Sequence, residues 1–404
     1  MNKEKRGPII ALVSMGFLVF SPFGTILLMR YLGFPLSLPE LLIIPYVFIF
    51  RKRYSFSPIG KKRAIGFISL WILMIFISIL AQRYSILAVI SSSRTYLTLI
   101  IAYLIFSKKN NVSLDDVMYI SLGATLGWLY SSIYGINLYI EGTTDVVSRV
   151  GNMIAIPLLI SIAVIKKHNK TLFLAIILCI AISITAGVRR QIVVFLASLF
   201  LTYGILFFKN FKKNKKQFFE LILIILVFLT VLPQISNYVK ENIPVLYFRV
   251  FQKSENFLKG ENDQSGDSIR LENMSYLIRD FSDYIIPKGF ISRRTIEDGT
   301  GNFIDFPLLE LFYMFGFLLA LVLLLIFAIQ TFRCYKQSSK TNNDSLIFVI
   351  LSLIMFMLLF LEGTFLSSSY VAPLTGYCLG RLKFHSKLNF VIGKKESQMI
   401  NKYE

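Results

Sequence analysis

The chain has 404 residues, a formal net charge of +20 and 55% hydrophobic residues, with a mean hydropathy of +0.64. A soluble domain cannot bury that much apolar surface, so the composition predicts an integral membrane protein. A strongly basic chain can also indicate nucleic-acid binding, but here the basic residues lie in short loops beside apolar runs. We therefore expect no nucleic-acid partner and attribute the charge to membrane topology and to contact with the lipid bilayer.

Apolar runs of about 16–25 residues recur along the whole chain, which is the length that a helix needs to cross the hydrocarbon core. Such continuous runs differ from the alternating strands of a membrane barrel. The sequence therefore predicts an all-α polytopic membrane protein with about twelve transmembrane helices, or eleven if the last two runs form one span. The expected spans are residues 8–29, 32–50, 64–82, 86–106, 117–135, 151–165, 171–186, 191–208, 218–236, 304–329, 346–361 and 365–380.

The loops between these runs predict the orientation. With the N-terminus inside, 28 of the 43 basic residues fall in cytoplasmic segments, as the positive-inside rule requires. This topology places both termini on the cytoplasmic side of the membrane. It divides the chain into helices 1–9 (1–236), one large periplasmic loop with an amphipathic helix (237–303), helices 10–12 (304–380) and a basic cytoplasmic tail (381–404).

Several kinds of chemistry have no sequence support. The three cysteines form no CxxC pair, both histidines (His168 and His385) fall on the cytoplasmic side, and no clustered acid pair marks a metal site. Neither a Walker motif nor a GxGxxG motif is present. We expect no metal, no nucleotide and no other cofactor, and therefore no ATP-driven transport by this polypeptide.

Arginine and lysine divide differently across the predicted bilayer. Of the 28 inner basic residues 22 are lysines, whereas 11 of the 15 outer ones are arginines. A planar guanidinium donates two parallel hydrogen bonds to phosphate, so this bias predicts an anionic ligand on the outer side. Ion pairs with outer acids are the alternative for any one arginine, and contact with lipid phosphate is a further alternative for Arg30 and Arg83.

Some outer arginines occupy positions typical of a binding site. Arg189 and Arg190 open a span after a tight turn, Arg149 precedes Gly151 and Asn152 at another span start, and Arg94 lies near the edge of a span. Helix N-termini and guanidinium groups would then point at one anion, and an ionisable residue at membrane depth is usually functional.

Outer carboxylates are the ordinary candidates for proton transfer, because no histidine lies outside. Glu272 ranks first, since it follows Arg270 on one turn of the predicted loop helix 267–284, which also carries Arg279. The other candidates are Glu141, Asp145, Asp280, Asp283, Asp305 and Glu310.

The order of these features resembles the bacterial O-antigen polymerases and the related O-antigen ligases. The resemblance covers roughly residues 138–320 and rests on short motifs. These are Ser148-Arg149-Val150-Gly151-Asn152, Thr185-Ala186-Gly187-Val188-Arg189-Arg190-Gln191, Ser268-Ile269-Arg270 in the late outer loop, and Gly301-Asn302-Phe303 running into Tyr313-Met314-Phe315-Gly316-Phe317. The usual turn motif has serine where Val188 stands, which leaves open whether Arg189 or Arg190 is the equivalent arginine.

The resemblance implies a membrane glycosyltransferase that joins undecaprenyl-pyrophosphate-linked oligosaccharide repeat units into O-antigen or capsular polysaccharide, on the outer face of the bacterial inner membrane. It also implies a chain-length regulator and a flippase as partners. Arg189, Arg190, Arg270 and Glu272 would be catalytic. Substrate would be bound by Arg94, Arg149, Asn152, Arg279 and Asn302. Ligases carry a histidine in the large outer loop and this chain has none there, which favours a polymerase. An O-antigen ligase and a flippase or transporter of lipid-linked oligosaccharide are the alternatives.

Overall fold

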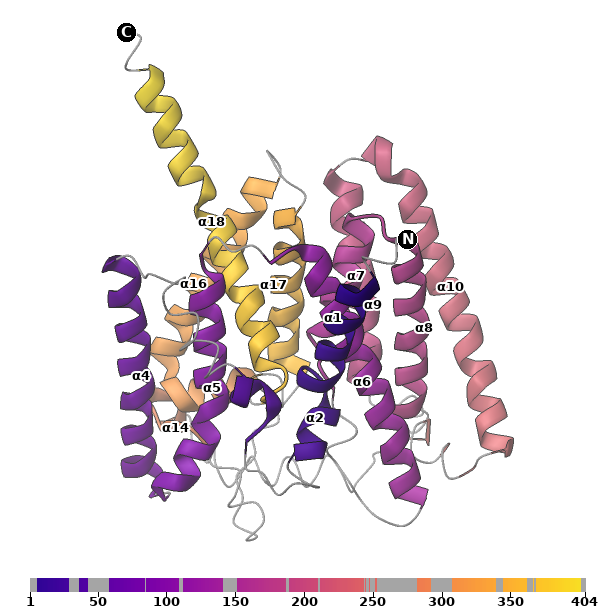
Figure 1. Cartoon of the computed structure of the whole chain (residues 1–404), viewed down its shortest axis with the longest axis horizontal. Coiled ribbons are helices and arrows are strands. Elements are labelled where there is room, and N and C mark those ends of the chain that lie inside the picture. The colour runs from indigo at the N-terminus through magenta and orange to yellow at the C-terminus, as the bar shows by residue number, and fades with distance from the viewer. Residues whose placement is uncertain are drawn as a thin grey trace.

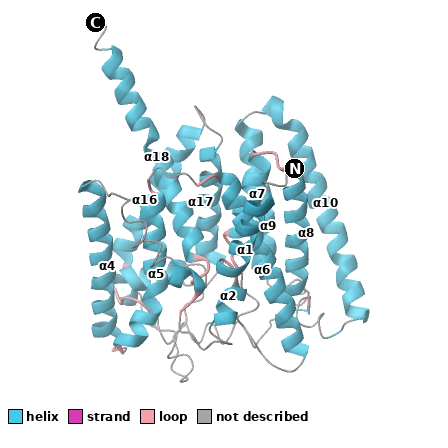
Figure 2. Ribbon diagram, in the orientation of Figure 1, coloured by secondary structure: helices cyan, strands magenta, loops and turns pink. Residues whose placement is uncertain are grey.

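The computed structural model describes residues 6–28, 36–42, 58–83, 85–108, 112–140, 151–186, 189–209, 211–242, 244, 247, 251–252, 282–291, 307–338, 344–361, 366 and 368–400. In this part of the chain the regular elements are helices, without strands (Figure 2). Their bounds are α1 Arg6–Val19, α2 Pro22–Ile26, α4 Pro58–Gln82, α5 Ile86–Phe106, α6 Leu114–Ile140, α7 Ala155–Ile165, α8 Asn169–Ala186, α9 Arg189–Lys209, α10 Phe211–Asn242, α14 Ser282–Ile285, α15 Pro307–Phe315, α16 Phe317–Ser338, α17 Asp344–Leu361 and α18 Ala372–Ile400.

The long helices stand side by side as a bundle, and the last part of α18 projects beyond it (Figure 1). Six of the described helices are long and apolar enough to cross a membrane: residues 64–82 of α4, α5, α8, residues 190–209 of α9, α16 and α17. This confirms the expected all-α membrane class. The number of twelve spans stays a prediction, and so does the large loop, because most of residues 237–303 lies outside the described part.

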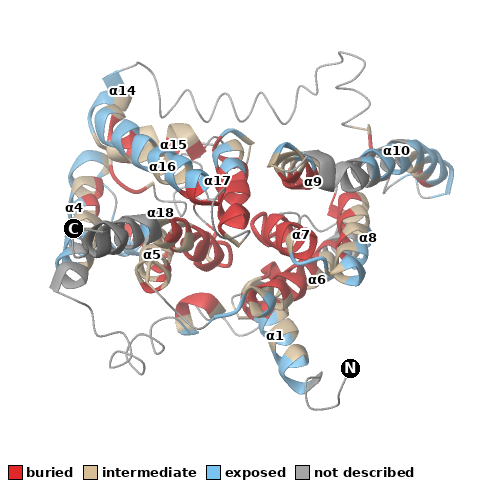
Figure 3. Ribbon diagram, turned by 90° about the horizontal axis from the view of Figure 1, so that it is seen from above, coloured by how far each residue is buried: buried red, intermediate tan, exposed pale blue. Residues whose placement is uncertain are grey.

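The centre of the bundle is formed by α7 and α17, which are buried, whereas α4 and α16 present mostly exposed apolar side chains (Figure 3). Every residue from Ala155 to Val164 of α7 is buried. A helix that is apolar on all faces is stable only when other helices or lipid surround it. The exposed faces of α4 and α16 are accordingly the faces that a bilayer would cover.

Two expected spans are broken in the structure. The described part of the expected span 8–29 contains α1 and α2, with a break at Phe20 and Ser21, where the Ser21 side chain caps α2 and Pro22 opens it. The described part of the expected span 304–329 is also two helices, because Gly316, with φ +74°, separates α15 from α16. At each break a residue with a restricted or left-handed backbone conformation, Pro22 or Gly316, ends the helix although the sequence stays apolar.

The described helix ends and loops lie at two ends of the bundle. At one end, Lys166 pairs with Asp344, His168 contacts Asp115, and the Lys209 ammonium donates to the Ser338 carbonyl. We call this the expected cytoplasmic end. The other end, the expected outer end, holds the contacts of Gln82 with Lys288 and of Asn152 with Tyr370. The contact of Tyr96 with Glu310 lies at the middle of α5. Which end faces the cytoplasm stays a prediction.

Candidate functional site

Few of the predicted site residues fall in the described part of the chain. Arg149, Arg270, Glu272, Arg279 and Asn302 lie outside it, as does most of the predicted amphipathic helix 267–284. Arg189 is the first residue of α9, but its side chain is likewise outside the described part. Their roles stay predictions. Arg94, Asn152 and Arg190 can be placed.

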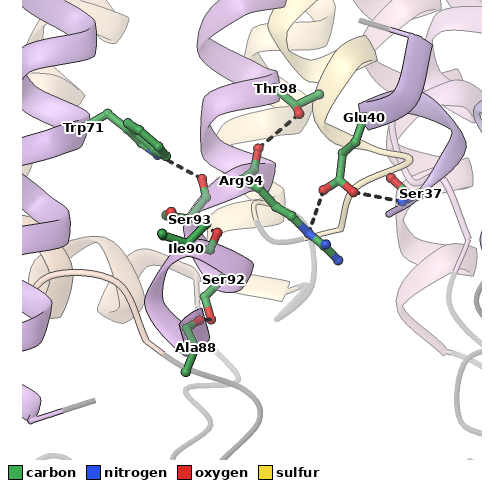
Figure 4. Close-up of polar contacts among 9 residues, drawn as sticks. All are labelled: Ser37, Glu40, Trp71, Ala88, Ile90, Ser92, Ser93, Arg94 and Thr98. Carbon is green, nitrogen blue, oxygen red and sulfur yellow. Dashed lines mark hydrogen bonds and ion pairs between the residues drawn. The ribbon is translucent and has the colours of Figure 1, made fainter. Parts of the chain in front are cut away.

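Arg94 forms an ion pair inside the bundle (Figure 4). Its Nε lies 3.1 Å from Oε1 of Glu40, whose side chain is only 3% exposed. Oε2 of the same carboxylate accepts a hydrogen bond from the Ser37 amide at 2.9 Å. Arg94 thus points toward segment 36–42, on the side of α5 away from Trp71. A buried carboxylate already neutralises this guanidinium, so an anionic ligand of Arg94 must share it with Glu40.

Asn152 uses its side-chain amide to join three parts of the expected outer end. Nδ2 donates to the carbonyls of Phe20 and Tyr370, both at 2.9 Å, and Oδ1 accepts from the amides of Ile154 and Ala155, both at 3.2 Å. The side chain is fully buried. Its hydrogen-bonding capacity is therefore filled by the protein. Asn152 therefore connects the chain segments that immediately precede α2, α7 and α18.

The neighbouring Gly151 explains why a glycine precedes this asparagine. A Cβ atom there would lie 1.8 Å from the Trp128 indole ring, so only glycine lets α7 approach α6 this closely. The glycine and asparagine of the sequence motif therefore have packing roles that the structure displays directly.

Arg190 lies half-buried at the start of α9. The next residue, Gln191, is 1% exposed and donates from Nε2 to the Ile182 carbonyl at 3.0 Å. This contact holds the start of α9 against the end of α8. Arg190 is thus the second residue of α9 at the expected outer end, and the expected tight turn before it, residues 187–188, lies outside the described part of the chain.

A second buried carboxylate lies on the other side of α5. The Tyr96 hydroxyl donates to Oε1 of Glu310 at 2.6 Å, and Glu310, in the first turn of α15, is 6% exposed. The Tyr96 ring packs on Phe290 with 5.1 Å between ring centroids. Sequence reasoning named Glu310 among the candidate bases but gave no partner for it. Glu40 and Tyr96 were missed, although an acid within the expected span 32–50 is itself a signal of function.

Segment 287–291 inserts between α4 and α15 and closes the site from the expected outer end. The Phe290 amide donates to the Ser78 hydroxyl at 2.6 Å, the Gly289 amide donates to the Met314 carbonyl at 3.1 Å, and Gln82 Nε2 donates to the Lys288 carbonyl at 2.6 Å. Gly289 has φ +80°, and a Cβ there would meet the Ser78 hydroxyl oxygen at 2.2 Å. A side chain at this position would push the segment out of its groove.

Beneath this segment lies a partly open apolar cavity of about 410 Å³. Tyr96 and Phe290 line it toward the expected outer end, and Tyr103 and Lys383 line it toward the other end. Most lining side chains come from α4, α5, α15, α16, α17 and α18, with Phe290 from segment 287–291 and Leu366 from the connection between α17 and α18. The helical ones are Phe67, Leu70, Trp71, Met74, Tyr96, Leu99, Ile100, Tyr103, Leu311, Phe315, Leu323, Leu324, Ile326, Phe327, Gln330, Met355, Leu359, Thr375, Leu379 and Lys383. A hydrocarbon chain matches such a lining.

Several buried polar atoms in different elements of the bundle have no hydrogen-bond partner in the described part of the chain. They are Thr25 Oγ1, Ser37 Oγ, Gln82 Oε1, Trp128 Nε1 and Gln191 Oε1. Buried polar groups are nearly always satisfied by protein, water or ligand, so a water molecule or a ligand group would complete the hydrogen bonding of each atom. None of these side chains lines the apolar cavity.

The described residues contain no group of three or more histidine, cysteine or acidic side chains that could hold a metal ion. In comparisons with known proteins, no protein-family model and no curated protein matches this chain.

Proposed function

We propose that this protein is a membrane glycosyltransferase that joins lipid-linked oligosaccharide repeat units, as the O-antigen polymerases do. The observation that carries the proposal is the apolar cavity of about 410 Å³, which is lined by Tyr96, whose hydroxyl donates to the buried carboxylate of Glu310. A polyprenyl pyrophosphate needs this combination, because its hydrocarbon chain must lie among apolar helices while its pyrophosphate and sugars meet polar groups.

In this mechanism the outer arginines hold the pyrophosphate of the donor. The bond between the anomeric carbon and the pyrophosphate oxygen breaks, and the pyrophosphate keeps the electron pair. Guanidinium groups stabilise the charge that it gains, and the expected ones are Arg189 or Arg190, together with Arg149 and Arg270. Arg94 would bind the pyrophosphate only by giving up part of its contact with Glu40, whose Oε1 lies 3.1 Å from Nε of Arg94.

A carboxylate accepts the proton of the acceptor sugar hydroxyl as the new glycosidic bond forms. Glu272 is the first candidate from the sequence. Among the described carboxylates, Glu310 is the best placed, because its partner Tyr96 lines the cavity and Leu311 next to it does as well. No nucleotide is required for this reaction, since the lipid pyrophosphate already activates the donor.

The test is polymerisation in a polymerase-deleted strain that supplies the lipid-linked repeat unit. The wild-type gene should restore a ladder of long chains. Leu99→Trp, which fills the cavity, should abolish the ladder, whereas Leu87→Trp on the same helix should preserve it, because Leu87 is 71% exposed and lies outside the cavity. A product of single capped repeats would contradict polymerisation and indicate a ligase.

The cavity also supports a second candidate function, the flipping of a lipid-linked oligosaccharide. Its lining extends from Tyr96 to Tyr103 and Lys383 at the other end of α5, where the Lys383 ammonium donates to the Tyr103 hydroxyl. A transporter would need polar groups at both ends of a lipid path. Vesicles containing purified protein and lipid-linked repeat distinguish the two, since a flippase moves the lipid between leaflets without lengthening the glycan.

A further inference from the structure

A second cavity, of about 360 Å³, lies at the expected cytoplasmic end, remote from the site described above. It is bounded by the start of α6, the turn between α7 and α8, the start of α17 and the middle of α18. Both histidines of the chain line it. The charged side chains in its wall are Asp115, Lys166, Asp344 and Arg381.

Three of these charged side chains already have partners in the wall of the cavity. Lys166 Nζ lies 2.7 Å from Oδ1 of Asp344, and His168 Nε2 lies 3.3 Å from Oδ1 of Asp115. Both aspartates also lie in the first turn of a helix, where the helix dipole favours a negative charge. The two carboxylates are therefore satisfied within the wall of the cavity.

Arg381 is the cation that is not matched. Its guanidinium makes one hydrogen bond, from Nη2 to Nε2 of His385 at 3.3 Å, and has no carboxylate within ion-pair distance in the described part of the chain. A guanidinium carries five N–H donors, so this single bond uses only one of them. The group lies over the Phe384 ring at 4.6 Å and near the Phe348 ring at 5.8 Å. Aromatic faces thus fix its position while its donors stay available.

His385 cannot take over the role of a counter-ion. It is 6% exposed and stacks on Phe348 with 5.2 Å between ring centroids. As the acceptor of the Arg381 hydrogen bond, its Nε2 carries no proton, so the imidazole is neutral. The cavity therefore presents a half-buried guanidinium with a neutral neighbour and with Lys166 and His168 elsewhere in its wall.

We infer that this cavity binds a phosphate oxyanion, with Arg381 as its principal ligand. A planar guanidinium with adjacent free donors binds phosphate through two parallel hydrogen bonds. Lys166 can turn from Asp344 toward the ligand, because its side chain is 35% exposed. The phosphate can belong to the headgroup of an anionic phospholipid in the adjoining leaflet or to a soluble phosphate compound.

The first experiment measures the effect of inorganic phosphate on the melting temperature of purified protein in detergent, against chloride at equal ionic strength. The proteins are the wild type, Arg381→Gln, Arg381→Lys and Arg333→Gln. Arg333 is the matched control, because it is an exposed arginine near the same end of the bundle. If the ligand is soluble phosphate, wild type and Arg333→Gln should show a saturable rise. Arg381→Gln should show none, and Arg381→Lys should need about tenfold more phosphate.

The second experiment measures by native mass spectrometry which lipids the same proteins keep from nanodiscs of phosphatidylglycerol and phosphatidylcholine. If the ligand is a headgroup, wild type and Arg333→Gln should keep phosphatidylglycerol and both Arg381 variants should keep less. For each variant, the shift caused by phosphate is measured from that variant's own melting temperature without phosphate. If Arg381→Gln folds poorly, Arg381→Lys, which keeps the charge, still tests the site. Binding that is equal in all four proteins, or absent from both experiments, would overturn the inference.

Discussion

Glu40 and Arg94 are the residues where the structure most changes the expected chemistry. The sequence predicts that Arg94 binds pyrophosphate, and the structure gives it a buried carboxylate partner at 3.1 Å. These two roles are separable. If the pair is only structural, two neutral side chains can replace it. If Arg94 binds pyrophosphate, its positive charge is needed for function.

We predict that Glu40→Gln alone lowers the stability by up to about 3 kcal/mol, because it leaves the Arg94 charge without its counter-ion. The double variant Glu40→Gln with Arg94→Gln should recover most of that loss but should remain unable to polymerise. Melting temperature and the glycan ladder, measured on all four combinations, decide the matter. A double variant that is both stable and fully active would remove Arg94 from the binding site.

His385 supplies a prediction on pH. Burial, and then the neighbouring Arg381 charge, lower the pKa of His385 from 6.5 to about 4, while Asp344 acts in the opposite direction. Above pH 6.5 the imidazole is neutral in both folded and unfolded protein. Between pH 6.5 and 4 only the unfolded chain binds the proton, so acidification lowers the free energy of unfolding, by at most about 3 kcal/mol. Unfolding midpoints measured from pH 7.5 to 4.5 should therefore fall less steeply in His385→Gln than in wild type.

At the scale of elements, the non-helical break between α15 and α16 places the inserted segment 287–291 beside the candidate site. The break at Gly316 separates α15 from α16, and Pro287 of the inserted segment lies beside it, since a Cβ on Gly316 would lie 3.0 Å from Pro287 Cδ. The same Cβ would lie 2.7 Å from the Ile285 carbonyl oxygen. The break thus links the inserted segment to the helix that carries Glu310.

We predict that Gly316→Ala destabilises the protein by at least about 1–2 kcal/mol, the usual cost of a left-handed conformation for a residue with a Cβ, with the contact to Ile285 added. The control is Gly204→Ala inside α9, where a Cβ would meet nothing within 4 Å. That substitution should stabilise by up to about 1 kcal/mol, because alanine is the better helix former. Equal melting temperatures for the two variants would contradict the role given to the break.

The sequence predicted the helices well and the site only partly. Hydropathy averaged over about twenty residues identifies the spans that became α4, α5, α8, α9 and α17. The same average does not register the breaks at Ser21 and Gly316, because each depends on one or two residues and on what packs against them. The Tyr96–Glu310 contact joins positions 214 residues apart, so no local pattern reveals it. Charge and predicted position indicate the outer arginines as candidate ligands of an anion. Neither reveals that the partner of Arg94 in the structure is Glu40.

At the scale of the whole molecule, the candidate site and the phosphate cavity lie at opposite ends of one bundle. The contact of Gln82 with the inserted segment belongs to one end and the Lys166–Asp344 pair to the other. The polymerase proposal requires the first end to face the periplasm, because the repeat units are joined there. Its orientation in the membrane is therefore the condition on which the proposed reaction depends.

We predict that a cysteine at position 282 reacts with a membrane-impermeant maleimide in intact spheroplasts, whereas a cysteine at position 170 reacts only after lysis. Ser282 and Lys170 are both exposed and lie at opposite ends of the bundle, so each cysteine would present its thiol to solvent at its own end. The native cysteines, Cys179, Cys334 and Cys378, are all buried and should give little background. Labelling at position 170 but not 282 in intact spheroplasts would invert the topology and place Glu310 and Arg190 on the cytoplasmic side. Because lipid-linked repeats are joined in the periplasm, that result would end the polymerase proposal, whatever the effect of the cavity variants.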